Sequence, residues 1–137
     1  MTKYIPILLT AILLACQSST QQKEEVDLDE LRKEVLAIHD EVMPKMGTLK
    51  RVKNSLLLQA DSLGATDSLS TTLRETADAI AVANENMMAW MRQYEPAFEG
   101  TDEEVLRYLQ EQKSSIEKVQ KDMLESLAKG EELLGGE

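Results

Sequence analysis

The sequence predicts an all-α protein: an antiparallel up-down-up three-helix bundle with coiled-coil packing and a long first helix kinked by proline. The 137 residues are rich in Leu, Ala, Glu, Lys, Gln and Met, and aromatic residues make up only 4%. This composition favours long helices over a β-sandwich. Apolar residues recur at alternating spacings of three and four, which is the pattern of helices packed along their length. Short connections make consecutive helices antiparallel.

The first predicted helix covers about residues 25–62 and contains Pro44. Proline lacks a backbone donor and clashes with the preceding turn, so we expect a kink there. The apolar spacing keeps its phase from Val42 to Leu49, which favours one kinked helix over two separate helices. Apolar residues occupy every seventh position, and others alternate with them: Leu28, Leu31, Val35, Ile38, Val42, Leu49, Val52, Leu56 and Leu63.

The second predicted helix follows a tight reversal over residues 63–70 and ends at about Tyr94. Gly64 and several capping residues suit such a reversal. Alanines keep this helix slim, so its neighbours can approach closely. Its core positions are Leu69, Leu73, Thr76, Ile80, Ala83, Met87, Trp90 and Tyr94.

The third predicted helix begins after a break marked by Pro96 and Gly100. Thr101 followed by Glu104 matches a capping box, in which the two side chains satisfy the first free backbone donors of a helix. We expect this helix to fray near Gly130. Its core positions are Val105, Leu109, Ile116, Val119, Met123 and Leu127.

Residues 1–15 have the features of a signal peptide, with Lys3 ahead of an apolar run that is too short to span a bilayer. The run ends in Leu-Leu-Ala-Cys, which resembles the lipobox of bacterial lipoproteins, so Cys16 is the expected lipidation site. An ordinary signal peptide, or an anchor helix with an incidental cysteine, is the alternative. Residues 16–24 are polar and predict a tether, and residues 25–137 form the bundle domain.

Lipidation at Cys16 predicts attachment to a membrane of the cell envelope, because acyl chains on one residue give firm anchoring. Gln17 rather than aspartate follows the cysteine, which favours the outer membrane of a Gram-negative bacterium. Partners are then the membrane itself and a helical protein or a second copy of the chain. The net charge of −10 without a Lys/Arg cluster argues against nucleic-acid binding.

Two runs of sequence carry a family resemblance: E-V-L-A-I-H-D-E-V-M-P-K-M-G and, further on, M-M-A-W-M-R-Q-Y-E. Over most of the chain after Cys16, the sequence is similar to small bacterial lipoproteins that often carry the label "viral A-type inclusion protein". The resemblance implies a lipoprotein but no mechanism. The viral label reflects generic coiled-coil composition.

Catalytic chemistry has little support in the sequence. His39 is the only histidine, and its neighbour Asp40 is expected to point to a different side of the helix, so no oriented base is predicted. Phosphate loops, zinc-ligand spacings and EF-hand loops are also missing from the sequence. We therefore predict no enzyme and no cofactor. A membrane-tethered interaction or structural module is favoured over a metal-handling lipoprotein and over a carrier of small ligands or lipids.

A partner interface is one hypothesis for the start of the first helix. In an antiparallel pair that turns near residues 64–68, Ile38 lies opposite Tyr94, so earlier residues have no partner on the second helix. An uncovered apolar face of this kind suits an oligomer or a partner helix. The alternative is that the loop over 95–101 and a longer third helix cover it. The residues are Val26, Leu28, Leu31 and Val35.

A soft-metal site is the other hypothesis. Most of the methionines, the only histidine and the only tryptophan are expected at the same level of the bundle. Thioether and imidazole ligands suit Cu(I) or Ag(I), and an indole face can add a cation–π contact. The alternative is that the methionines fill irregular space beside the proline kink. The candidate ligands are His39, Met43, Met46, Met87, Met88 and Met91.

Overall fold

The computed structural model describes residues 27–64 and 66–135 of the chain. The predicted signal peptide over residues 1–15, the lipidation site Cys16, the tether over 16–24 and Val26 all lie outside these residues.

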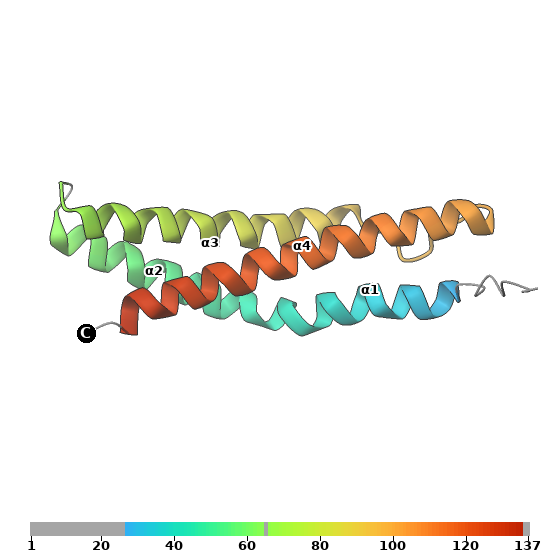
Figure 1. Ribbon diagram of the computed structural model, residues 1–137, viewed down its shortest axis with the longest axis horizontal. Helices are drawn as coiled ribbons and strands as arrows, with labels where there is room; N and C mark the ends of the chain where they lie inside the picture. Colours follow the sequence, from blue (N-terminus) through green and yellow to red (C-terminus); the bar gives the residue numbers. More distant parts are fainter. Residues whose placement is uncertain (1–26, 65, 136–137) are drawn as a thin grey trace, which may run out of the picture.

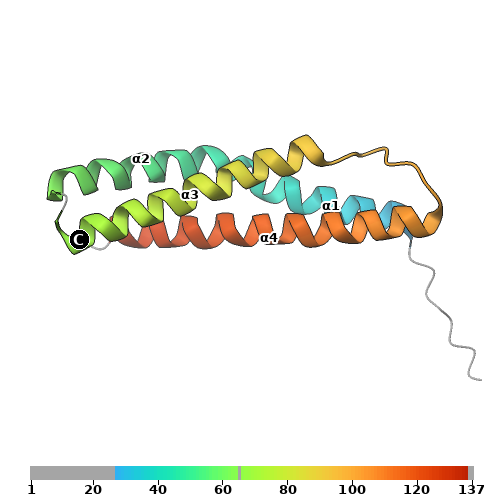
Figure 2. The same ribbon diagram turned by 90° about the horizontal axis from the view of Figure 1, so that it is seen from above.

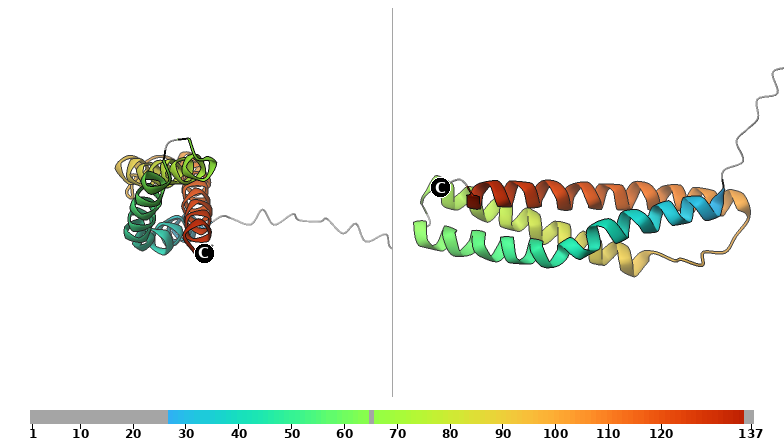
Figure 3. Two further views of the ribbon diagram at one scale, coloured as in Figure 1. Left: turned by 90° about the vertical axis from the view of Figure 1, so that its left-hand side faces the viewer. Right: turned by 90° about the horizontal axis from the view of Figure 1, so that it is seen from below.

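Three rods of helix lie side by side and confirm the predicted all-α bundle (Figure 1). The first rod consists of α1 (Leu28–Val42), the short helix η1 (Met43–Lys45) and α2 (Met46–Leu63). It is followed by α3 (Ser68–Gln93) and α4 (Asp102–Gly135). The rods run up, down and up, and viewed from the end they surround a common centre (Figure 3). Within residues 27–64 and 66–135, no helix is both long and apolar enough to cross a bilayer.

The predicted kink at Pro44 is confirmed as a short 3-10 turn within a continuous rod. The N–H of Met43 still donates to the carbonyl of His39, as in an α-helix, whereas the N–H of Met46 donates to the carbonyl of Met43. Proline at the start of the turn has no N–H to donate, and the tighter bonding pattern accommodates it. Both α1 and α2 therefore keep a buried face toward the same core.

α1 and α4 run parallel in a fixed register. The Nζ of Lys113 donates to Glu34 at 2.7 Å, and the Nε2 of Gln120 donates to Glu41 at 3.0 Å. Both pairs join residues 79 positions apart. Each helix advances by the same two turns between them, so the two heptad patterns stay in phase along the contact.

The core residues agree closely with the apolar positions of the sequence. Val35, Val42, Leu49 and Leu56 from the first rod are fully buried. All six positions expected on the third helix are buried in α4. On α3 the buried set is Ser70, Leu73, Thr76, Ala77, Ile80, Ala83, Met87 and Trp90.

The turn between α2 and α3 departs from the expected pattern. Leu63 and Leu69 are 41% and 42% exposed, while Ser70 is fully buried. The Asp67 side chain accepts from the N–H groups of Leu69 and Ser70, which starts α3 at Ser68. The Ser70 hydroxyl then donates to the carbonyl of Ala60 at 3.0 Å. This hydrogen bond joins α2 to α3 at the end of the bundle, where packing of Leu63 and Leu69 was expected instead.

The expected fraying near Gly130 is wrong, because α4 continues to Gly135 and Gly130 is buried. A Cβ atom at position 130 would lie 2.6 Å from Cγ1 of Val52 and 3.1 Å from Cδ1 of Ile80. Glycine therefore lets α4 approach α2 and α3 more closely than any other residue could. This close approach comes with the low helix propensity of glycine, which costs about 1 kcal/mol relative to alanine.

At the start of the first helix, the alternative of a face covered by the loop and the third helix is confirmed, and the hypothesis of an uncovered face is wrong. α3 ends at Gln93, and the loop over 94–101 spans the remaining length of the rods (Figure 2). Leu31 packs in a second, smaller core with Val105 and Leu109 of α4, and Leu28, Phe98, Leu106 and Tyr108 pack against it. Val35 is fully buried in the main core. A partner could not reach Leu31 and Val35 without displacing α4, so we do not retain an interface there.

The loop over 94–101 is held at both of its ends. The Arg32 side chain donates to the carbonyl of Pro96 at 2.7 Å, and the N–H of Glu95 donates to the Tyr108 hydroxyl at 2.6 Å. The predicted capping box is confirmed, since Thr101 N–H donates to Glu104 and Glu104 N–H donates to the Thr101 hydroxyl. These bonds from Thr101 hold the pKa of the Glu104 carboxyl below its usual value.

Candidate functional site

Five rings form a continuous stack across the bundle, which we call the aromatic row. His39 of α1 lies 5.6 Å from Trp90 of α3, and Trp90 lies 4.7 Å from Tyr94, measured between ring centroids. Tyr94 lies 6.3 Å from Tyr108 of α4, which lies 4.2 Å from Phe98. All four ring pairs are stacked, and three of them lie within about 4.5–7 Å, the usual range for aromatic pairs, while Tyr108 and Phe98 are slightly closer. The row joins α1, α3, α4 and the loop over 94–101 at the level where α3 ends.

His39 lies at one end of this row with one ring nitrogen engaged. Its Nδ1 is 2.9 Å from Oδ1 of Asp40, and the imidazole is 18% exposed. The expectation that the two side chains diverge is therefore wrong, because the exposed Asp40 carboxylate bends back to the ring. When the imidazole is neutral, Nδ1–H donates to Asp40 and Nε2 carries the free lone pair.

Trp90 and Tyr94 of the aromatic row each carry one buried polar atom without a hydrogen-bond partner among the described residues. Among the described residues, neither the Nε1 of Trp90 nor the hydroxyl of Tyr94 has a hydrogen-bond partner, although both atoms are buried. Burial raises the pKa of the Tyr94 hydroxyl, and the nearby Arg32 charge partly opposes this. Stacking with the neighbouring rings therefore holds these two side chains, at some cost in lost hydrogen bonds.

The methionines expected near His39 differ in exposure. Met87 is fully buried in the core, and Met46 and Met91 are partly buried and packed against it. Met43 and Met88 are 44% and 41% exposed. The structure therefore provides both core and surface thioethers at this level. In the described part of the chain, no three His, Cys, Asp or Glu side chains come together as a metal site.

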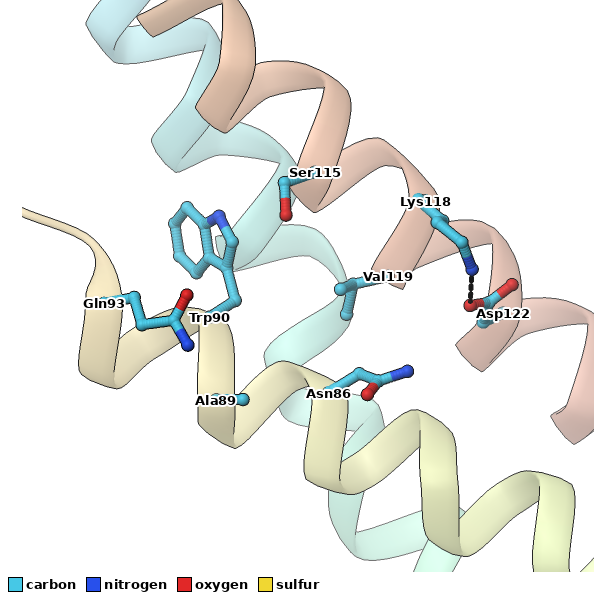
Figure 4. Close-up of a pocket in the computed structure, with 8 residues that line it drawn as sticks. All are labelled: Asn86, Ala89, Trp90, Gln93, Ser115, Lys118, Val119 and Asp122. Atoms are coloured by element: carbon cyan, nitrogen blue, oxygen red, sulfur yellow. Dashed lines mark hydrogen bonds and ion pairs between the residues drawn. The ribbon is translucent and has the colours of Figure 1, made fainter. Parts of the chain in front are cut away.

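A groove of about 230 Å³ lies beside Trp90, between α3 and α4 (Figure 4). Ala89 and Val119 line it beside the indole, and Lys118 is paired with Asp122 at 2.6 Å. Asn86, Gln93 and Ser115 complete the lining. Ligand pockets usually enclose about 300–1,000 Å³ and are mainly apolar. This small groove, whose lining is about half polar, does not have the form of a lipid-binding cavity.

Sequence reasoning placed His39 level with Trp90 but missed the rest of the row. The spacing of four between Trp90 and Tyr94 was a usable signal, because such residues share one helix face. The contribution of Tyr108 and Phe98 had no local signal. It depends on how the loop over 94–101 returns the chain to α4.

No family model, curated protein or solved structure is significantly similar to this chain. The resemblance of the H-D-E-V-M-P-K-M-G run to small bacterial lipoproteins therefore stays a prediction.

Proposed function

We propose that the protein is a lipid-anchored, non-catalytic helical module of the bacterial cell envelope. The observation that carries this proposal is the run Leu13-Leu14-Ala15-Cys16 at the end of a short apolar segment, followed directly by a polar tether. Cleavage before Cys16 and acylation of its thiol would attach the bundle to a membrane, in keeping with the outer membrane expected from Gln17.

The shape of the bundle supports a role as a projecting module. α1 begins at Leu28, at the opposite end of the rods from the turn over 64–67 (Figure 1). α4 has 34 residues, which corresponds to about 50 Å at about 1.5 Å per residue. A bundle anchored through the tether would carry that turn well away from the lipid surface. A helical protein of the envelope, or a second copy of the chain, would meet its sides or far end.

The charge at the anchor end supports the same arrangement. Exposed carboxylates gather around the start of α1 and α4, and Lys33 and Arg107 are the exposed bases among them. Anionic lipid surfaces attract basic segments and repel acidic ones. The bundle would therefore stand off such a surface. The exposed carboxylates nearest these helix starts are Asp27, Asp29, Glu30, Glu99, Asp102, Glu103 and Glu104.

The surroundings of His39 favour a non-catalytic role. Its ring contacts Asp40 and stacks on Trp90. Within residues 27–64 and 66–135, its hydrogen-bond partner is Asp40, and no serine or threonine hydroxyl is hydrogen-bonded to it. Nucleophilic catalysis by a serine or threonine requires its hydroxyl within reach of the base.

Replacing Cys16 with serine should abolish lipid attachment. In cells fed labelled fatty acid, the natural chain should acquire label and appear in the membrane fraction at a size shortened by signal cleavage. The Cys16→Ser chain should acquire no label and accumulate as the longer precursor, because serine offers no thiol to acylate. A Ser18→Ala chain is the matched control and should behave as the natural chain. Normal labelling of the Cys16→Ser chain would refute the proposal.

A further inference from the structure

We propose that His39, Met43 and Met46 form a binding site for Cu(I), with Ag(I) as its close analogue, against the face of Trp90, with a thioether of α3 completing it. The proposal concerns the folded bundle alone and does not depend on the lipid anchor.

The backbone around Pro44 aligns the three ligands of the first rod. Met43 donates its N–H to the His39 carbonyl, so these two residues are one α-helical turn apart on one face. Met46 donates its N–H to the Met43 carbonyl in the 3-10 turn. Side chains three apart in a 3-10 helix eclipse one another. The kink therefore keeps imidazole and both thioethers in one column.

The imidazole is oriented as in known metal sites. Nδ1 is 2.9 Å from the Asp40 carboxylate, which fixes the tautomer that leaves the Nε2 lone pair free. A carboxylate on the second nitrogen of a histidine ligand orients the ring and raises its basicity. The same ring stacks on Trp90 at 5.6 Å with an interplanar angle of 29°. A metal ion on this histidine would thus lie near an indole face, where a cation–π contact can add to binding.

α3 supplies the remaining sulfur from the flank that faces the first rod. Asn86, Ala89 and Gln93 line the groove on the α4 side of α3. By helical periodicity, Met88 and Met91 lie on the opposite flank. Met91 is partly buried against the core and Met88 lies at the surface. Met87 is fully buried in the core, so we exclude it from the ligands.

The chemistry of the set selects a soft monovalent ion. Thioethers and imidazole bind Cu(I) and Ag(I) well, whereas Mg²⁺ and Ca²⁺ require oxygen ligands. In the described part of the chain, no cluster of three carboxylate or imidazole groups competes for a harder ion. The exposure of Met43 gives the ion a path from solvent. Methionine packing beside the kink would explain the buried Met87 but does not require an exposed thioether next to an oriented histidine.

Titration of the full chain with Ag(I), and with Cu(I) under anaerobic reducing conditions, tests the site. Every sample carries Cys16→Ser in detergent solution, because a free thiol would itself bind these ions. One equivalent of either ion should raise the melting temperature and quench the fluorescence of Trp90, the only tryptophan. Met43→Leu should weaken the affinity at least tenfold without unfolding the bundle, since Met43 is 44% exposed and lies outside the core. His39→Ala with Met43→Leu should abolish both effects.

Two conservative variants serve as controls. Two thioethers lie outside the site and are removed by Met87→Leu, in the core, and by Met123→Leu, in the buried face of α4. Both variants should bind the ions as tightly as the chain that carries Cys16→Ser alone. The proposal is overturned if the chain with Cys16→Ser alone shows neither a melting shift nor quenching. It is equally overturned if the His39→Ala, Met43→Leu chain binds as tightly as the Met123→Leu chain.

Discussion

Replacing Trp90 with alanine is expected to lower the free energy of unfolding by about 3–5 kcal/mol, the usual cost of deleting a buried aromatic side chain. The indole is 5% exposed and stacks on both His39 and Tyr94. Its loss would leave a cavity at the level where α3 ends and would cut the aromatic row in two. We expect the value near the lower limit, because the unpaired Nε1 already costs the folded state about 1–3 kcal/mol.

Trp90→Phe distinguishes the contribution of the stacking ring to stability from that of the indole N–H group. Phenylalanine keeps a stacking ring and removes the unpaired donor, so its cost should be less than half that of alanine. Leu58→Ala is the surface control, because Leu58 is 73% exposed and should change stability by only about 0.5 kcal/mol. Urea unfolding followed by far-UV circular dichroism measures all three. A cost for Trp90→Ala no larger than for Leu58→Ala would contradict the packing described above.

Replacing Gly130 with leucine should destabilise the bundle by about 1–3 kcal/mol or more, as expected for forcing atoms into a filled core. Even the first added carbon would lie 2.6 Å from Val52 and 3.1 Å from Ile80. Val52 is β-branched and has little rotameric freedom to move away. α4 would have to shift outward from α2, which opens the main core around Leu56.

Gly47→Ala is the matched control with the opposite expected sign. Gly47 is exposed in the first turn of α2, where an added Cβ would meet only Arg51 Nη1 at 3.9 Å. Alanine should therefore raise stability by about 0.5–1 kcal/mol through helix propensity alone. Thermal unfolding of both variants gives the comparison. Shifts of the same sign and size would show that Gly130 acts through propensity rather than close packing.

Local signals in the sequence predicted most of the fold. The heptad positions Val35, Val42, Leu49 and Leu56 are all fully buried, because periodicity alone decides which face of a helix can be removed from water. Thr101 and Glu104 formed the expected capping box, which depends on residues three apart. Pro44 produced the expected kink, because its ring cannot be accommodated in a regular helix.

Features that depend on contacts distant in the sequence were not predictable in this way. Gly130 has the local properties of a helix end, and only the neighbouring Val52 and Ile80 explain why it lies inside one. For Leu31, helix spacing left open whether its apolar face was free or covered by a longer third helix, and α4 does cover it. At the candidate site, the shared level of His39 and Trp90 followed from helix register, whereas the contact between His39 and Asp40 depends on side-chain rotamers that spacing does not determine.

The parallel register of α1 and α4 has a consequence for the order of folding. Contacts between α2 and α3 close only the short turn over 64–67, whereas the Lys113–Glu34 pair closes a loop of 79 residues. The entropic cost of loop closure grows with length, and such non-local contacts slow folding. We expect the α2–α3 hairpin to form first and α1 to dock on α4 last. In native-state hydrogen exchange, the amides of Leu31 and Val35 should then open at lower denaturant concentrations than those of Leu73 and Ile80. The half of the bundle that contains the start of α1 would be the first to unfold.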